Sequence, residues 1–294
     1  INVAVLQPSF NPWNEKFERD PIDMQLEMES LSEKGIDSAT DWLLWPETCL
    51  VRSIDIDYLE RNNQVQMLQK DLLSRYPQLQ LLTGFHGVKY YQTQSKPTRS
   101  ARKSTYDKGI FYDVYNSALC LQSGEKPSYY HKSKLVPGTE QMPFIHTIPF
   151  LEELAISLDE NSISGSLGVC DSAYSLGKDN PVAPIICYES IYGDYIRGYL
   201  ERGATWLGIV TNDAWWENTP GHKQHFSYAK LRAIEFRKWV ARSANTGISG
   251  FIDPTGKSYD DTEWYVKTCP KRTIWANSDK TVYYHLGDLG VLGI

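Results

Sequence analysis

Short apolar segments that alternate with longer amphipathic ones constrain the fold of this 294-residue chain more than any other feature. Val3–Leu6, Trp42–Trp45, Ala183–Cys187 and Trp206–Thr211 are apolar over nearly their whole length. Runs of this kind are typical of strands that are buried on both faces, as in sheets covered by helices. The pattern therefore predicts an α/β fold.

Helices are expected between these strands. In Ile22–Lys34, Met24, Met28 and Leu31 recur at helical spacing and would share one face. Further helices are expected at Asn63–Tyr76, Tyr192–Arg202 and Gln224–Val240. A hairpin is expected from Tyr115–Gln122 and Pro127–Lys132, and the polar, basic segment Gln92–Lys108 is expected to be an exposed loop.

Composition excludes several function classes. The net charge of −6 leaves no basic surface for nucleic acid, so no nucleic-acid partner is expected. The five cysteines are odd in number and none forms a CxxC pair, which argues against a disulfide framework and against a zinc site. No apolar stretch approaches the ~18–20 residues that span a bilayer.

Both ends of the sequence resemble cut ends. The chain opens directly on a strand-like segment without an initiator Met and closes on the apolar run 287–294. We therefore expect residues 1–294 to be a single domain excised from a longer protein. On this expectation, the lack of a membrane segment says little about the parent protein.

Cys187 is the first candidate catalytic residue. It ends an apolar strand and is followed by Tyr188, Glu189 and Ser190. Strand ends face the cleft of an α/β sheet, where a nucleophile would lie. The alternative is a packed core cysteine, because free cysteine is among the most buried residue types.

Two other segments supply the groups that a thiol nucleophile needs. Glu47 follows Trp45 and Pro46, so it would lie at the tip of a strand as a general base. Lys132 and Lys134 lie two apart and would share one face of a strand, and alternation does not choose between them. A lysine there would stabilise a thiolate and an oxyanion.

Together these groups predict acyl transfer through a thioester. The glutamate would take the thiol proton, the thiolate would attack a carbonyl, and the lysine with the Tyr188 backbone N–H would hold the oxyanion. A Cys–His hydrolase is the competing arrangement, since six histidines are available. His222 and His225 have HxxH spacing without an intervening Glu, and we interpret both as loop or helix-start residues.

Three segments resemble the Glu, Lys and Cys boxes of the nitrilase (carbon–nitrogen hydrolase) superfamily. They are Trp45-Pro46-Glu47, Lys132-Ser133-Lys134-Leu135-Val136-Pro137 and Ile186-Cys187-Tyr188-Glu189-Ser190, in the family's order. The resemblance implies a nitrilase-like α-β-β-α four-layer sandwich. It also implies that Lys132, rather than Lys134, is the catalytic lysine.

Within that superfamily the chain is similar to the apolipoprotein N-acyltransferase family. The similarity rests on Leu135-Val136-Pro137 with Glu140, Thr211-Asn212-Asp213-Ala214-Trp215-Trp216, 232–237 and 241–250. The family often has Phe-Gly where this chain has Gly138-Thr139, which leaves the local loop shape open.

This resemblance implies a transferase without a cofactor. The acyl donor would be a membrane phospholipid, and the acceptor would be the α-amino group of a diacylglyceryl-cysteine in an apolipoprotein. The domain would lie on the periplasmic face of a bacterial inner membrane, held by helices absent from this chain. Glu140 would orient Lys132, Tyr188 and Glu189 would support the nucleophile loop, and Trp215 would line the acyl pocket or pack in the core.

Two rival functions remain open. A soluble amidase or nitrilase would use the same triad with water as the second nucleophile. A domain that only binds acyl chains or peptides would keep the residues without turnover.

Overall fold

The computed structural model describes residues 1–11, 15–16, 18–93, 95–104, 107, 109–141 and 167–290. In this part of the chain, eight strands form a first sheet in the order β13-β1-β2-β4-β6-β5, with β3 beside β4 and β7 beside β6. These strands are β1 (Asn2–Val5), β2 (Trp42–Leu44), β3 (Leu50–Asp55), β4 (Gln80–Gln92), β5 (Arg102–Lys103), β6 (Ile110–Gln122), β7 (Ser128–His131) and β13 (Lys271–Thr273).

The second sheet has the order β12-β11-β10-β9-β8. Its strands are β8 (Val182–Ile186), β9 (Trp206–Thr211), β10 (Val240–Ala244), β11 (Gly250–Ile252) and β12 (Ser258–Tyr259). The helices are α1 (Pro21–Glu33), α2 (Asn63–Met67) with its continuation η2 (Leu68–Leu73), α4 (Gly193–Glu201), α5 (Pro220–Phe236) and α6 (Val282–Leu286). Short helical turns occur at η1 (Ile56–Arg61), η3 (Cys187–Ile191), η4 (Asp213–Trp216) and η5 (Gly287–Gly290).

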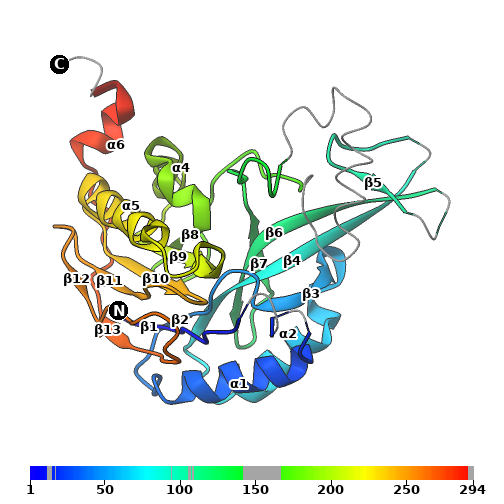
Figure 1. The fold of residues 1–294 in the computed structure, drawn as a ribbon, viewed down its shortest axis with the longest axis horizontal. Coiled ribbons are helices and arrows are strands. Elements are labelled where there is room, and N and C mark those ends of the chain that lie inside the picture. Colours follow the sequence, from blue (N-terminus) through cyan, green and yellow to red (C-terminus); the bar gives the residue numbers. More distant parts are fainter. Residues whose placement is uncertain are drawn as a thin grey trace.

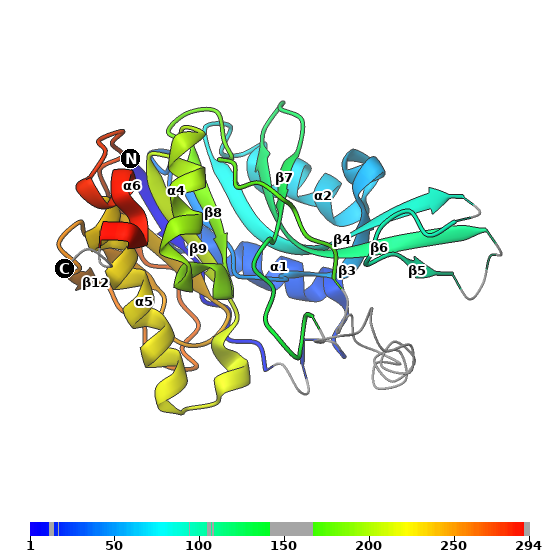
Figure 2. The same ribbon diagram turned by 90° about the horizontal axis from the view of Figure 1, so that it is seen from above.

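The two sheets pack face to face between two helical layers (Figure 1). One apolar core joins Trp42 and Leu82 of the first sheet to Ile209 of the second. A separate core joins Met24 and Met28 of α1 to the outer face of the first sheet. Figure 2 shows α4 and α5 over the second sheet, away from α1. The α-β-β-α sandwich predicted from the resemblance is confirmed.

Parallel pairing gathers the candidate site at one edge of the sandwich. Strand β2 is parallel to β1 and β4, and β9 is parallel to both β8 and β10. The carboxyl ends of parallel strands meet at the same edge of a sheet. Glu47, Cys187 and Asn212 all follow such ends, at β2, β8 and β9.

The prediction of a helix over Gln224–Val240 was wrong at its end. Helix α5 stops at Phe236 because Arg237 adopts the left-handed conformation, with φ 50° and ψ 42°. The next residues turn into β10, which is buried along its whole length. The predicted exposed loop Gln92–Lys108 was also wrong in part, since Arg102 and Lys103 pair with β6 as strand β5.

Candidate active site

Glu47 is held rigidly after β2. Its side chain is buried, and Oε1 accepts a hydrogen bond of 2.7 Å from Asn116 Nδ2, whereas Oε2 accepts one of 3.1 Å from the backbone N–H of Asn212. Gly84 on β4 lies directly against this residue, because a Cβ there would come within 2.6 Å of Glu47 Cα. The absence of a side chain at Gly84 therefore lets β4 support the glutamate backbone.

Lys132 follows β7 and points at Glu47. Its backbone N–H bonds to the Asn116 carbonyl at 2.8 Å, and its buried Nζ lies 3.3 Å from Glu47 Oε1 and 2.9 Å from Glu140 Oε1. Burial alone would lower the pKa of a lysine, but the charges of Glu47, Glu140 and Cys187 outweigh it and raise the pKa of Lys132. Lys132 therefore stays protonated at neutral pH.

Lys134, the alternative from the sequence, lies elsewhere. Its Nζ is over the ring of Tyr195, 5.0 Å from the ring centroid. The structure thus brings Lys132, not Lys134, to the two carboxylates.

Glu140 completes the charged cluster. Its Oε1 accepts hydrogen bonds from Lys132 and, at 2.8 Å, from Asn116 Nδ2, and its Oε2 accepts one from the Val136 N–H at 2.8 Å. Asn116 thus donates to both carboxylates and holds them around the lysine.

Cys187 is the first residue of η3, directly after β8. It is partly exposed and has a φ of 47°, in the left-handed region that favours glycine. Burial and then the charge of Glu47 raise the pKa of its thiol to about 12, against the opposing effects of Lys132 and of a hydrogen bond with Thr211. The resting thiol is therefore neutral at neutral pH, and an adjacent base is needed to ionise it.

Glu189 connects the segment that carries Cys187 to the segment that carries Lys132. Its buried Oε1 accepts hydrogen bonds of 2.7 Å from the Ser133 N–H and from the Tyr130 hydroxyl, and its Oε2 accepts one of 2.9 Å from the Ile186 N–H. Burial raises the pKa of this carboxyl. Glu189 thereby connects the residues that flank Lys132 and Cys187.

Tyr188 and Trp215 are less well defined as site residues. Tyr188 is half-buried, and its ring packs edge to face on Tyr192, with 5.4 Å between the centroids. Trp215 lies in η4, but its side chain is outside the described residues. Its predicted place in an acyl pocket therefore stays a prediction.

Sequence reasoning missed several polar residues around the site. Asn116 on β6 carried no signal, and Asn212 was noticed only as part of a longer segment. His225, interpreted as a helix-start residue, instead lies inside α5 with its Nε2 3.1 Å from the Cys187 carbonyl oxygen. Its position on the same helical face as Phe226 and Ala229 was the available sign of burial.

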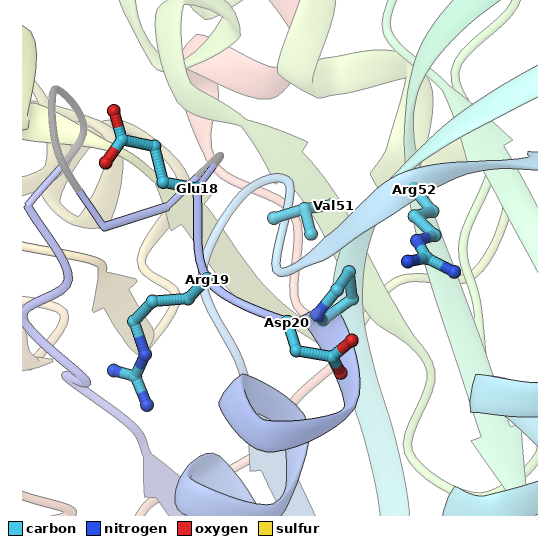
Figure 3. A pocket seen from close by; sticks show the side chains of 6 residues that line it. Glu18, Arg19, Asp20, Val51 and Arg52 are labelled. Carbon is cyan, nitrogen blue, oxygen red and sulfur yellow. The ribbon is translucent and has the colours of Figure 1, made fainter.

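Two surface pockets of about 410 Å³ each lie at other places. One is at the start of α1 and is lined by Glu18, Arg19, Asp20, Pro21, Val51 and Arg52 (Figure 3). The other lies by β6 and β7, near the Lys178–Glu125 ion pair. Neither is lined by Glu47, Lys132 or Cys187, and Figure 3 shows charged side chains around the first pocket without a nucleophile.

Within the described ranges, no helix is both long and apolar enough to cross a membrane. In the same part of the chain, no three His, Cys, Asp or Glu side chains gather as a metal site would require.

Comparison with known proteins finds one matching family model and several similar proteins. Residues 98–274 match the family model described as carbon–nitrogen hydrolase. This stretch contains Lys132 and Cys187, and Glu47 precedes it. Over 294 residues the chain is 30% identical to the apolipoprotein N-acyltransferase of Chlorobaculum tepidum, covering 98% of this chain and 54% of that protein.

A second relative is apolipoprotein N-acyltransferase 1 of Treponema denticola, 28% identical over 99% of this chain and 54% of that protein. The chain thus spans about half the length of these curated relatives.

Solved structures share the fold at low identity. A mutant amidase of the nitrilase superfamily from Nesterenkonia AN1 aligns with a TM-score of 0.62 at 12% identity, covering 100% of this chain and 96% of that one. A nitrilase-superfamily protein from Saccharomyces cerevisiae aligns with a TM-score of 0.62 at 14% identity, covering 99% and 94%.

Proposed function

Because the chain belongs to the carbon–nitrogen hydrolase family, we propose that it is the catalytic domain of an N-acyltransferase that matures lipoproteins. The observation that carries the chemistry is the cluster in which Lys132 lies between Glu47 and Glu140, with the charges of Glu47 and Lys132 both acting on the pKa of Cys187. The names of the curated relatives support the acyl acceptor.

In the first half-reaction Glu47 acts as general base. It takes the proton of the neutral Cys187 thiol as the sulfur attacks the ester carbonyl of a phospholipid, such as phosphatidylethanolamine. The oxyanion that forms is held by the Lys132 ammonium and by the Tyr188 backbone N–H. Glu47 then gives its proton to the departing lysophospholipid oxygen, and an acyl thioester remains on the sulfur.

In the second half-reaction the α-amino group of a diacylglyceryl-cysteine attacks the thioester. Glu47 accepts a proton from the attacking nitrogen and returns one to the Cys187 sulfur as the C–S bond breaks. The product is an amide-linked third acyl chain on the lipoprotein. Lys132 stays protonated through both steps, as its raised pKa allows.

Water must be kept from the thioester, or the enzyme would hydrolyse lipids. We propose that residues 1–294 act on the periplasmic face of a bacterial inner membrane, with membrane helices of the whole protein completing the acyl site. Trp215 is proposed as a wall of that site.

The experiment supplies the full-length protein with phospholipid carrying a labelled acyl chain and with a diacylglyceryl-cysteine peptide. The acyltransferase proposal expects the label on the peptide amine. Release of the label as free fatty acid in place of acylated peptide would contradict it. Hydrolysis of small amides with the lipid untouched would favour the amidase alternative. Unaltered acyl transfer in Cys187→Ala or Glu47→Gln variants would overturn the proposed mechanism.

A further inference from the structure

A second buried polar cluster contacts the backbone of Cys187. It consists of Asp213 in η4, His225 in α5 and Arg242 in β10, all with side chains at most 6% exposed. Arg242 Nη2 lies 2.9 Å from Asp213 Oδ2, and His225 Nδ1 lies 3.0 Å from Asp213 Oδ1. The cluster therefore joins η4, α5 and β10 next to η3, the turn that begins at Cys187.

His225 is the member that reaches this turn. Its Nε2 lies 3.1 Å from the Cys187 carbonyl oxygen and 3.0 Å from Ser190 Oγ, and the Ser190 hydroxyl donates to the same carbonyl at 2.8 Å. A carbonyl oxygen only accepts hydrogen bonds, so this contact requires the tautomer with the proton on Nε2, in which Nδ1 accepts from Arg242 Nη2 at 3.1 Å. Asp213 already has a charged partner in Arg242, so it does not need a proton from His225.

The position of this contact matters because Cys187 is strained. A non-glycine residue with a φ of 47° costs free energy and persists only where the surrounding structure holds it. The carbonyl of Cys187 and the N–H of Tyr188 belong to one planar trans peptide group and point in opposite directions. Holding the carbonyl from one side therefore aims the N–H to the other side.

We propose that His225 is a positioning residue for Cys187: by donating from Nε2 to the Cys187 carbonyl, it holds the strained peptide that carries the thiol and the Tyr188 N–H. This inference rests on the proposed role of Cys187 as nucleophile. It assigns to His225 no contact with substrate. The Asp213–Arg242 pair in turn holds the imidazole ring in place.

The test compares three substitutions at residue 225 by the rate at which iodoacetamide alkylates Cys187 in the full-length protein, from pH 7 to pH 11. A Gln amide nitrogen reaches nearly as far as His Nε2, whereas Asn and Ala do not reach the carbonyl. We expect His225→Gln to keep a rate within about twofold of the parent, and His225→Asn and His225→Ala to react about tenfold more slowly, as the loss of one buried hydrogen bond implies.

His222→Gln is the matched control. His222 lies one turn earlier on α5, and its ring packs on Trp264 with 4.5 Å between the centroids. We expect this variant to alkylate at the parent rate. Thermal unfolding of all the variants measures any general loss of stability.

Parent-like alkylation in all three variants at residue 225 would overturn the proposal. An equal slowing in all three, in proportion to their loss of thermal stability, would also overturn it, because packing alone would explain that result. Alkylation needs neither acyl donor nor acceptor. The result therefore stands even if the protein proves to transfer its acyl group to water.

Discussion

At the scale of single residues, the candidate site holds a protonated lysine and a proposed nucleophile that is neutral at rest. Lys132 is flanked by two carboxylates and keeps its proton, whereas the thiol of Cys187 has a pKa raised to about 12. A resting thiolate would be disfavoured by burial and by the charge of Glu47. In the proposed mechanism, proton transfer to Glu47 during attack avoids that state, so the carboxylate is essential to it.

Glu47→Gln should have opposite effects on turnover and on thiol ionisation. Removal of the base should lower acyl transfer by about 10²- to 10⁴-fold. Because the Glu47 charge helps to raise the pKa of Cys187, its removal should lower that pKa and speed alkylation by iodoacetamide at pH 9. In the parent protein, the alkylation rate should keep rising with pH toward about 12.

The matched control for this prediction is Glu125→Gln, a change in an exposed carboxylate that pairs with Lys178. It should leave both rates unchanged. An alkylation rate in the parent that levels off near pH 7 would show a preformed thiolate and would contradict the proposed role of the base.

Strand ends and the chemistry of their residues identified Glu47, Cys187 and a lysine as candidates, and only the resemblance to a known family chose Lys132. Alternation alone did not choose between Lys132 and Lys134, because both follow one strand. Asn116 and His225 were missed because their partners lie 69 and 38 residues away along the chain, and no local pattern marks such contacts.

At the scale of elements, one carboxylate connects β7 to β8. Glu189 accepts hydrogen bonds from the Ser133 N–H after β7 and from the Ile186 N–H at the end of β8. These bonds span the gap between the segments that carry Lys132 and Cys187. The distance between the proposed cation and nucleophile therefore depends on a residue that contributes no chemistry of its own.

Glu189→Gln should destabilise the protein markedly. An amide places a donor where the carboxylate has an acceptor, so at least one buried N–H or hydroxyl loses its partner. We expect a loss of about 3 kcal/mol, which lowers the thermal midpoint by about 6 °C. The control is Glu201→Gln at the end of α4, where the side chain is 51% exposed and the midpoint should stay within about 1 °C.

An unchanged midpoint in Glu189→Gln would show that the hydrogen bonds of Glu189 do not hold the two strands. Equal falls in both variants would show that the loss is not specific to the buried position.

Strand β10 shows where element prediction from sequence fails. Its first residue, Val240, was included in the predicted helix Gln224–Val240, but all five residues of the strand are buried. The structure ends α5 at Phe236, and Arg242 is instead buried in a strand by its ion pair with Asp213. This ion pair links distant segments, so it leaves no trace in local periodicity.

At the scale of the whole molecule, the two sheets approach closely where β9 carries a glycine. A Cβ at Gly208 would lie 2.6 Å from Val182 Cγ2 and 3.3 Å from Leu82 Cδ2, and Leu82 belongs to the opposite sheet. The sandwich therefore depends on the absence of a side chain at this point. The short apolar segments between amphipathic ones predicted the strands. Only the resemblance to a known family predicted that two sheets pack face to face.

Gly208→Val should push the sheets apart. Overpacking of this kind costs about 1–3 kcal/mol, which corresponds to a fall of about 2–6 °C in the thermal midpoint. Lys103→Val on the exposed strand β5 is the control and should have little effect. A Gly208→Val variant that melts at the parent temperature would show that the two sheets do not pack closely at β9.

The proposed mechanism requires Cys187 to carry a fatty acyl group as a thioester. The most direct measurement is mass spectrometry of the full-length protein after incubation with phospholipid in the absence of acceptor. We predict that the peptide containing Cys187 gains the mass of one acyl chain, that hydroxylamine removes it, and that the Cys187→Ser variant gains no hydroxylamine-labile adduct. Consumption of the phospholipid acyl chain with Cys187 unmodified, or an acyl group found on another residue, would contradict this mechanism.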